Sequence, residues 1–448
     1  MTLQSEVRDS GPLRTIILST GALMLVIAVV ASPKEAFDAS IQGLDIWWKI
    51  IFPAMLPFLM LSQMLTAFGF THAIGALLGP LMQRWFRLPG NAGLAIAVGM
   101  CGGFPAGADA VSRLFQDRQI TAKQAVVLAA ASHFANPMMI ILVVGAAFLH
   151  QPAAGYFLLV VHWISGWIAA ILATRLLPAP GNQTNRVGST AAQADNNSFH
   201  SQLASPASPV SSISRSSTPH HATSKRRSIW SDMMIAAREA HRRDGRGFGK
   251  LLGDTVSQAV QTLMMTGGYM IGFAVFIRLV SLYLTPGSSA ALWPAFFELH
   301  LGTYHLSQTS LTPMLLISLL AAVLGWGGLC SHLQVSTVLK TTGPGSKSML
   351  YFAGVRLTHG FIAFFISLFL WMPFSRYSTE VWTTLQTNAE QDLSTPFGWL
   401  LIHSPGNTYT INTIWSVFPA ACMGLALLLA VMVSLSGLTF WFNRRFSR

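Results

Sequence analysis

Several stretches of this chain are apolar over about the thickness of a bilayer, and this feature constrains the fold more than any other. Examples are Leu13–Ala31, Ala153–Leu177, Met349–Met372 and Ile414–Phe442. Inside hydrocarbon every backbone N–H and C=O needs a partner within the protein, which leaves helices or closed barrels as spanning structures. Charged residues make up only 10% of the 448, against about 25% in soluble domains. The sequence therefore predicts an all-α polytopic membrane protein, with about eight transmembrane helices plus re-entrant or broken helices.

The apolar segments form two membrane halves, 13–177 and 251–443, which we expect to be related and inverted with respect to each other. The linker between them, 178–250, holds ten Lys/Arg and four Asp/Glu. Most of it is poor in apolar residues, which predicts disorder, and Ile229–Arg243 predicts a short amphipathic helix. A basic segment can bind nucleic acid, but basic loops also stay in the cytoplasm. We favour the second explanation and expect no nucleic-acid partner.

Lysine and arginine also predict the topology. They place residues 1–12, the linker and the tail 444–448 in the cytoplasm. The apolar segment 92–111 has Arg87 before it and Arg113 after it, so both of its ends lie on the inside. It is therefore expected to enter and leave on the same side, as a re-entrant hairpin.

The tip of this hairpin is rich in glycine and breaks the helix. Residues 99–109 read GMCGGFPAGAD, and such a break is tolerated at membrane depth only where it is packed or lines a polar cavity. The tip residues Gly102, Gly103, Phe104, Pro105 and Gly107 precede a helix whose N-terminus suits a carboxylate. The alternative is a packed hairpin in which glycines allow close contact. Asp109 can bind a coupling ion or proton, or pair with Arg113.

The next span, Ala122–Leu149, is expected to bend near Asn136 and Pro137. Ser132, His133 and Asn136 are polar in an otherwise apolar span, so we predict that they contact the substrate. His133 can also carry the coupling proton. The alternative is a histidine satisfied by a neighbouring carbonyl.

The second half contains a weak echo of the tip, since 325–339 reads GWGGLCSHLQVSTVL. The candidate binding residues there are Gly327, Gly328, Ser331, His332 and Gln334, followed by Arg356 and His359 in the next span. A planar guanidinium suits a carboxylate, although Arg356 can instead pair with Asp254 or Glu298. Gln258 and Gln261 are one helical turn apart and can line the same path. Whether 325–342 spans the membrane or re-enters stays open.

Segment 285–311 contains no lysine or arginine and is expected to be an outside loop. Glu298 lies in it and is expected to be interfacial. The pair Asp45 and Lys49 has the spacing of an ion pair on one helical face.

Five motifs carry a resemblance to a known family. They are WWKIIFPAMLPF at 47–58, GPLMQRWFRLPG at 79–90, GMCGGFPAGADAV at 99–111, ITAKQAVVLAAASHFANPMMI at 120–140 and GWGGLCSHLQV at 325–335. With them the chain resembles the sporulation integral membrane proteins of the YlbJ type, which contain a nucleoside-recognition or Gate domain. The resemblance implies a multi-pass protein of the bacterial cell membrane or the outer forespore membrane. It also implies that the chain moves dipicolinic acid, a small aromatic dicarboxylate, toward the forespore.

These patterns together predict a transporter of a small organic anion that works by alternating access around broken helices. We expect no cofactor and no metal, since Cys101, Cys330 and Cys422 have no metal-ligand spacing. The sequence contains no HExxH, P-loop or GxSxG motif, so we do not expect an enzyme. The alternatives are a sporulation membrane scaffold and a transporter of nucleosides or other small solutes. The lipid bilayer is an expected partner, and a homo-oligomer or sporulation membrane partners stay open.

Overall fold

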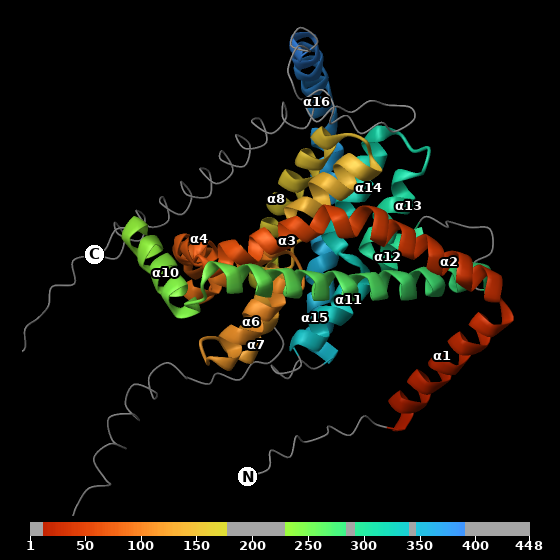
Figure 1. The fold of residues 1–448 in the computed structure, drawn as a ribbon, viewed down its shortest axis with the longest axis horizontal. Coiled ribbons are helices and arrows are strands. Elements are labelled where there is room, and N and C mark those ends of the chain that lie inside the picture. The colour runs from red at the N-terminus through yellow and green to blue at the C-terminus, as the bar shows by residue number, and fades with distance from the viewer. Residues whose placement is uncertain (1–11, 177–228, 284–291, 340–345, 390–448) are drawn as a thin grey trace, which may run out of the picture.

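The computed structural model describes residues 12–176, 229–283, 292–339 and 346–389 (Figure 1). In these ranges the regular secondary structure is helical, without strands. The predicted span 414–442, the tail and the linker part 178–228 lie outside the described residues.

Five helices are long and apolar enough to cross a membrane: Pro33–Ala67, Pro152–Arg175, Phe248–Tyr283, Pro313–Val338 and Ser348–Arg376. Shorter apolar helices accompany them, among them α1 (Pro12–Ala31), whose apolar side chains are largely exposed. The prediction of a polytopic all-α membrane protein is therefore confirmed.

The first half is built from a long helix, a hairpin, a broken helix and a closing helix. The long helix runs without interruption through α2 (Pro33–Ile46), η1 (Trp47–Ile51) and α3 (Phe52–Ala67). The hairpin is α5 (Gly93–Gly102) and α6 (Ala106–Gln116), the broken helix is α7 (Ala122–Ala131) and η4 (Met139–Phe148), and the closing helix is α8 (Pro152–Leu176). Between the long helix and the hairpin lie α4 (Phe70–Leu81), η2 (Met82–Phe86) and η3 (Gly90–Ala92).

The second half repeats this order of elements. Its long helix is α11 (Phe248–Tyr283), its hairpin is α12 (Leu292–Phe297) and α13 (Leu299–Ser307), its broken helix is α14 (Pro313–Trp326) and α15 (Gly328–Val338), and its closing helix is α16 (Ser346–Ala389). The additional helix α10 (Ile229–Asp244) precedes it.

Equivalent elements of the two halves pack on each other. The long helices lie side by side, with α11 along α2 and α3, and α8 packs on α16 (Figure 1). Trp47 Nε1 donates to the Leu263 carbonyl oxygen at 2.9 Å across the long helices. The hairpin arm α6 contacts α15, and the corresponding arm α13 contacts η4. This exchange of equivalent contacts is what two related halves produce.

The order of helices in the two halves changes which segment of the first half corresponds to 325–339. The break at Gly327 interrupts α14 and α15, so by element order it corresponds to the break between α7 and η4. The counterpart of the tip at 103–105 is the junction of α12 and α13 at Glu298. The segment 285–311, expected as an outside loop, is therefore helical over 292–307, which forms a hairpin with a buried core face, and its predicted place on the outside stays a prediction. The expectation of an interfacial Glu298 is wrong, since it is only 3% exposed.

The expected bend in Ala122–Leu149 is a complete break. Residues 133–136 have no regular secondary structure between α7 and the helix that begins at Pro137, so their backbone groups are available for tertiary hydrogen bonds. This irregular stretch is buried in protein, which is the condition under which broken helices occur at membrane depth.

Helix α10 lies where the sequence predicts a short helix, and it packs on α4 (Figure 1). Gly69 has φ +84°, and its Cα lies directly against the backbone of Ala237, so a side chain there has no room. Trp230 and Met234 on α10 are exposed. The predicted pair Lys49–Asp45 is present at 2.9 Å.

Candidate functional site

The hairpin tip packs against the irregular segment 133–136. Gly103 has φ +77°, and a Cβ built there would lie 2.9 Å from Asn136 Cβ, so both its conformation and its surroundings require glycine. The Phe104 N–H donates to the Phe134 carbonyl oxygen at 3.0 Å, and the Phe104–Pro105 peptide is cis. The tip and the first helix break therefore form one irregular unit.

Glycines of the two hairpin arms enclose the carbonyl of Ser132. A Cβ on Gly107 would lie 2.6 Å from this oxygen, and one on Gly99 would lie closer still. The same oxygen accepts the Phe134 N–H at 3.1 Å. Gly107 therefore serves close packing here, which was the alternative to a binding role.

Polar side chains order the first break. Asn136 Oδ1 accepts the Met139 N–H at 2.8 Å and so caps the helical turn that begins at Pro137 and continues as η4. The Ala135 N–H donates to His162 Nε2 at 3.0 Å. His133 stacks on Phe104 with ring centroids 4.6 Å apart. His162 is fully buried in α8 and was not among the predicted residues, although an ionisable residue in a span is a functional signal.

The second break meets the first. Gly327 and Gly328 have φ +82° and +77°, and a Cβ on Gly327 would lie 3.1 Å from His133 Nε2. His133 Nε2 also lies 3.2 Å from Ser331 Oγ at the start of α15. His332 Nε2 lies 3.0 Å from the Trp326 carbonyl oxygen. The two breaks, from opposite halves, therefore touch through His133.

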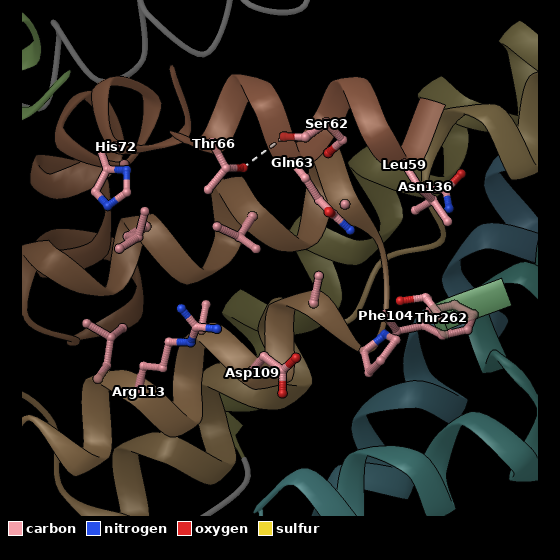
Figure 2. Close-up of a pocket in the computed structure, with 18 of the residues that line it drawn as sticks. Leu59, Ser62, Gln63, Thr66, His72, Phe104, Asp109, Arg113, Asn136 and Thr262 are labelled. Carbon is pink, nitrogen blue, oxygen red and sulfur yellow. Dashed lines mark hydrogen bonds between the residues drawn. The ribbon is translucent and has the colours of Figure 1, made fainter. Parts of the chain in front are cut away.

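A cavity of about 1570 Å³ opens beside this junction. The predicted residues that line it are Gly102, Phe104, Pro105, Asp109, Asn136, Gly327, Ser331 and Gln334. Gln258 and Gln261 of α11 line it too, as expected. Figure 2 shows Asn136 beside Leu59, and Asp109 across from Ser62 and Gln63 of α3. The cavity thus lies between the long helices and the hairpin tip.

The other predicted site residues lie behind the cavity wall. They are Gly103, Gly107, Ser132, His133, Gly328, His332, Arg356 and His359, all buried. Arg356 Nη2 donates to the Gly325 carbonyl oxygen. The alternative pairing of Arg356 with Asp254 or Glu298 is wrong, because Asp254 pairs with Arg246 and Glu298 with His300.

Glu298 and His300 are cavity residues that the sequence reasoning missed. His300 Nδ1 lies 2.7 Å from Glu298 Oε1, and Glu298 Oε2 accepts the Leu301 N–H at 2.7 Å. An acid directly before a short apolar helix was the available signal, since it marks a helix cap.

Two of the helices that begin at the cavity, one beside the hairpin tip and one beside the second break, have no side-chain cap. Helix α6 starts after Pro105 and α15 starts after Gly327, and neither has a side-chain cap. By contrast, Asn136 caps the helical turn that begins at Pro137 and continues as η4, and Glu298 caps α13. An uncapped N-terminus carries about half a positive charge and unpaired N–H groups. The cavity therefore receives two partial positive charges, one from each half.

Helix α10 and the start of α11 form the far end of the cavity. Arg246 binds Asp244 at 2.7 Å and Asp254 at 3.0 Å, which joins the two helices. The hydrogen bonds from Arg246 lower the pKa of Asp244 below its ordinary value. The Asp244 carboxylate therefore stays ionised at neutral pH and holds this junction.

Comparisons with known proteins support the resemblance. The model of the family described as "Gate: Nucleoside recognition" matches residues 48–152, which contain α3, the hairpin tip and the first break. The chain is 29% identical over 425 residues to "Sporulation integral membrane protein YlbJ" of Bacillus subtilis (strain 168), covering 90% of this chain and 95% of that protein. No solved structure matches the chain significantly. The resemblance predicted from the motifs is confirmed.

Proposed function

We propose that this chain is a membrane transporter that binds a small organic anion in the cavity between its two halves. The observation that carries the proposal is the pair of uncapped helix N-termini, α6 and α15, which open on one cavity. Anions bind at helix N-termini because the N–H groups and the helix dipole both favour negative charge. Two such ends match the two carboxylates of a small dicarboxylate.

Dipicolinate is the substrate that we propose, on the strength of the family resemblance. The similar protein of Bacillus subtilis is named as a sporulation integral membrane protein, and we extend that role to this chain. Phe104 offers an aromatic face beside the α6 N-terminus, which suits an aromatic ring. We place the protein in the cell membrane or the outer forespore membrane, with both termini in the cytoplasm.

Transport follows from the way in which the two halves meet. The contacts of His133 with Ser331 and of α6 with α15 join the halves at the breaks. Rocking of one half against the other would open the cavity to either side of the membrane, as in transporters with discontinuous helices.

The test is binding of labelled dipicolinate to the purified protein and its uptake into vesicles. Ser331→Asp places a carboxylate at the α15 N-terminus, where it would repel the substrate, and Ser331→Asn is the matched uncharged control. We expect Ser331→Asp to weaken binding at least about tenfold and Ser331→Asn to change it less than about threefold. Equal affinities in the two variants would refute a binding role for this N-terminus.

A nucleoside is the second candidate, and one observation favours it. The cavity is lined by the amide side chains of Gln63, Asn136, Gln258, Gln261 and Gln334, which can hydrogen bond base edges and hydroxyls. Competition by uridine against labelled dipicolinate distinguishes the two. A neutral nucleoside should also be insensitive to Ser331→Asp. A scaffold would transport neither solute and would lose its role on deletion of 181–228, whereas a transporter would keep uptake.

A further inference from the structure

A buried acid–histidine pair forms part of the cavity wall in the second half. The side chains of Glu298 and His300 are 5% and 8% exposed, and their nearest polar atoms lie 2.7 Å apart. Both residues line the cavity. Glu298 occupies the hairpin junction that corresponds to the Phe104–Pro105 tip of the first half. Ionisable groups at such depth are expensive and mark functional sites.

The charge of this pair depends on how many protons it holds. With one proton on His300 Nδ1, donated to the carboxylate, the pair has a net charge of about −1. A second proton on Nε2 makes the imidazole cationic, and the pair becomes neutral as a whole. The number of protons therefore decides whether the cavity wall carries a negative charge.

The helices packed on α13 bring few other titratable groups to this pair. Cys330 of α15 lies within the electrostatic range of Glu298, and Tyr269 of α11 lines the cavity. Helices α12, α14 and η4 contribute none, and α13 itself carries Tyr304 and His305. Lys250 and Arg278 of α11 lie outside the cavity-lining stretch 255–269, and Asp109 faces the cavity from α6. His332 of α15 is a further titratable group, and its Nε2 lies against the Trp326 carbonyl oxygen. Among the described residues of these elements, His300 is the cationic group that contacts Glu298.

The backbone of Glu298 and Leu299 also packs directly against the second break. A Cβ on Gly328 would lie 3.2 Å from the Cα of Glu298 and 2.9 Å from the Leu299 nitrogen. Gly328 opens α15, one of the two uncapped N-termini. A movement of Glu298 would therefore displace Gly328 at the α15 N-terminus, where we place one carboxylate of the substrate.

We propose that Glu298 and His300 form the proton-binding site that couples anion binding to protonation. The anion binds well when the pair holds its second proton and is neutral, and poorly when the pair carries a negative charge. Each anion would then enter the cavity together with one proton. This inference rests on the proposed function, because a neutral substrate would not respond to the charge of the pair.

The experiment measures dipicolinate affinity between about pH 6.5 and 8.5, where both probe carboxylates are ionised. In the wild type we expect the Kd to rise by up to about tenfold per pH unit, with uptake of about one proton per bound anion in weakly buffered solution. Glu298→Gln keeps an oxygen that can accept the Leu301 N–H but removes the acid. We expect it to bind with less than about twofold change per pH unit and without proton uptake.

Asp109→Asn tests the competing candidate for the coupling proton, another carboxylate that lines the cavity, and on our proposal this variant keeps the pH dependence. His300→Gln tests the pair from its other side and also covers a failure of Glu298→Gln to fold. Wild-type protein that binds no dipicolinate overturns the proposed function along with the coupling. Binding without pH dependence overturns the coupling alone. Retained pH dependence in Glu298→Gln or His300→Gln, or its loss in Asp109→Asn, also overturns it.

Discussion

Substituting Gly107 by alanine tests whether this glycine packs the hairpin or binds the substrate. Gly107 is buried near the start of α6, and a Cβ there would lie 2.6 Å from the Ser132 oxygen. The same Cβ would lie 3.1 Å from both the Gly99 Cα and Ser132 Oγ. An ordinary carbon–oxygen contact is about 3.3 Å, so the hairpin arm and the break must separate by about 0.7 Å.

The size of the effect follows from this overlap. Adding a methyl group to a well-packed interior destabilises by about 1–3 kcal/mol, and alanine returns up to about 1 kcal/mol through helix propensity. The Ser132 carbonyl cannot turn away freely, because it accepts the Phe134 N–H. We therefore expect Gly107→Ala to lower the free energy of unfolding by about 1–2 kcal/mol.

The assay is thermal unfolding in detergent, followed by tryptophan fluorescence. Gly268→Ala is the matched control, because a Cβ there meets nothing within 4 Å on the exposed side of α11. It should be neutral or stabilise the protein by up to about 1 kcal/mol. Equal stability of the two variants would refute the packing role of Gly107. Lost dipicolinate binding with unchanged stability would instead place Gly107 in the binding site.

Three further substitutions or conditions test other parts of the structure. Asn136→Ala should lower the free energy of unfolding by about 1 kcal/mol, because the Met139 N–H loses its acceptor. Asn136→Asp keeps an oxygen that can accept this N–H and should be less destabilising. Equal losses of stability in thermal unfolding would contradict the capping role of Asn136. Since Arg246 lowers the pKa of Asp244, their contact is stabilising above the ordinary carboxyl pKa and is lost as the pH falls through the lowered value. Hydrogen exchange at 241–250, corrected for its intrinsic rate, should therefore rise below about pH 4, and Arg246→Ala should show this rise already at pH 6. Arg356→Met should destabilise by about 2 kcal/mol, because the Gly325 carbonyl loses its donor, and leave dipicolinate affinity within about threefold. Lost affinity in a stable Arg356→Met protein would bring this residue into the binding site.

Much of the candidate site could be predicted because its residues break local rules. Glycines and a proline inside an apolar run, as at 99–109, conflict with a continuous helix, and the structure has a break there. Asn136 before Pro137 is a similar signal, and the helix is interrupted at 133–136. The resemblance rested on these same segments.

The errors arose where local signals do not determine the position of a segment. The absence of lysine and arginine in 285–311 reports only on topology, so it could not show that 292–307 is a hairpin. The glycine pattern suggested that the segment around Gly327 corresponds to the hairpin tip. The order of helices shows that it corresponds to the first break, between α7 and η4. Arg356 looked like a ligand because of its chemistry, and its hydrogen bond to Gly325 places it behind the wall.

The sequence by itself determined the helical class, the membrane setting and the positions of the breaks, because unpaired backbone groups and charges are costly in hydrocarbon whatever their partners. Only the tertiary structure decided which breaks meet and which polar groups face the cavity. The contact of His133 with Ser331 joins residues 198 positions apart. The pairing of Glu298 with His300 is local, but only the tertiary structure shows that both side chains line the cavity. Such contacts depend on how the two halves pack, and no local pattern encodes that packing.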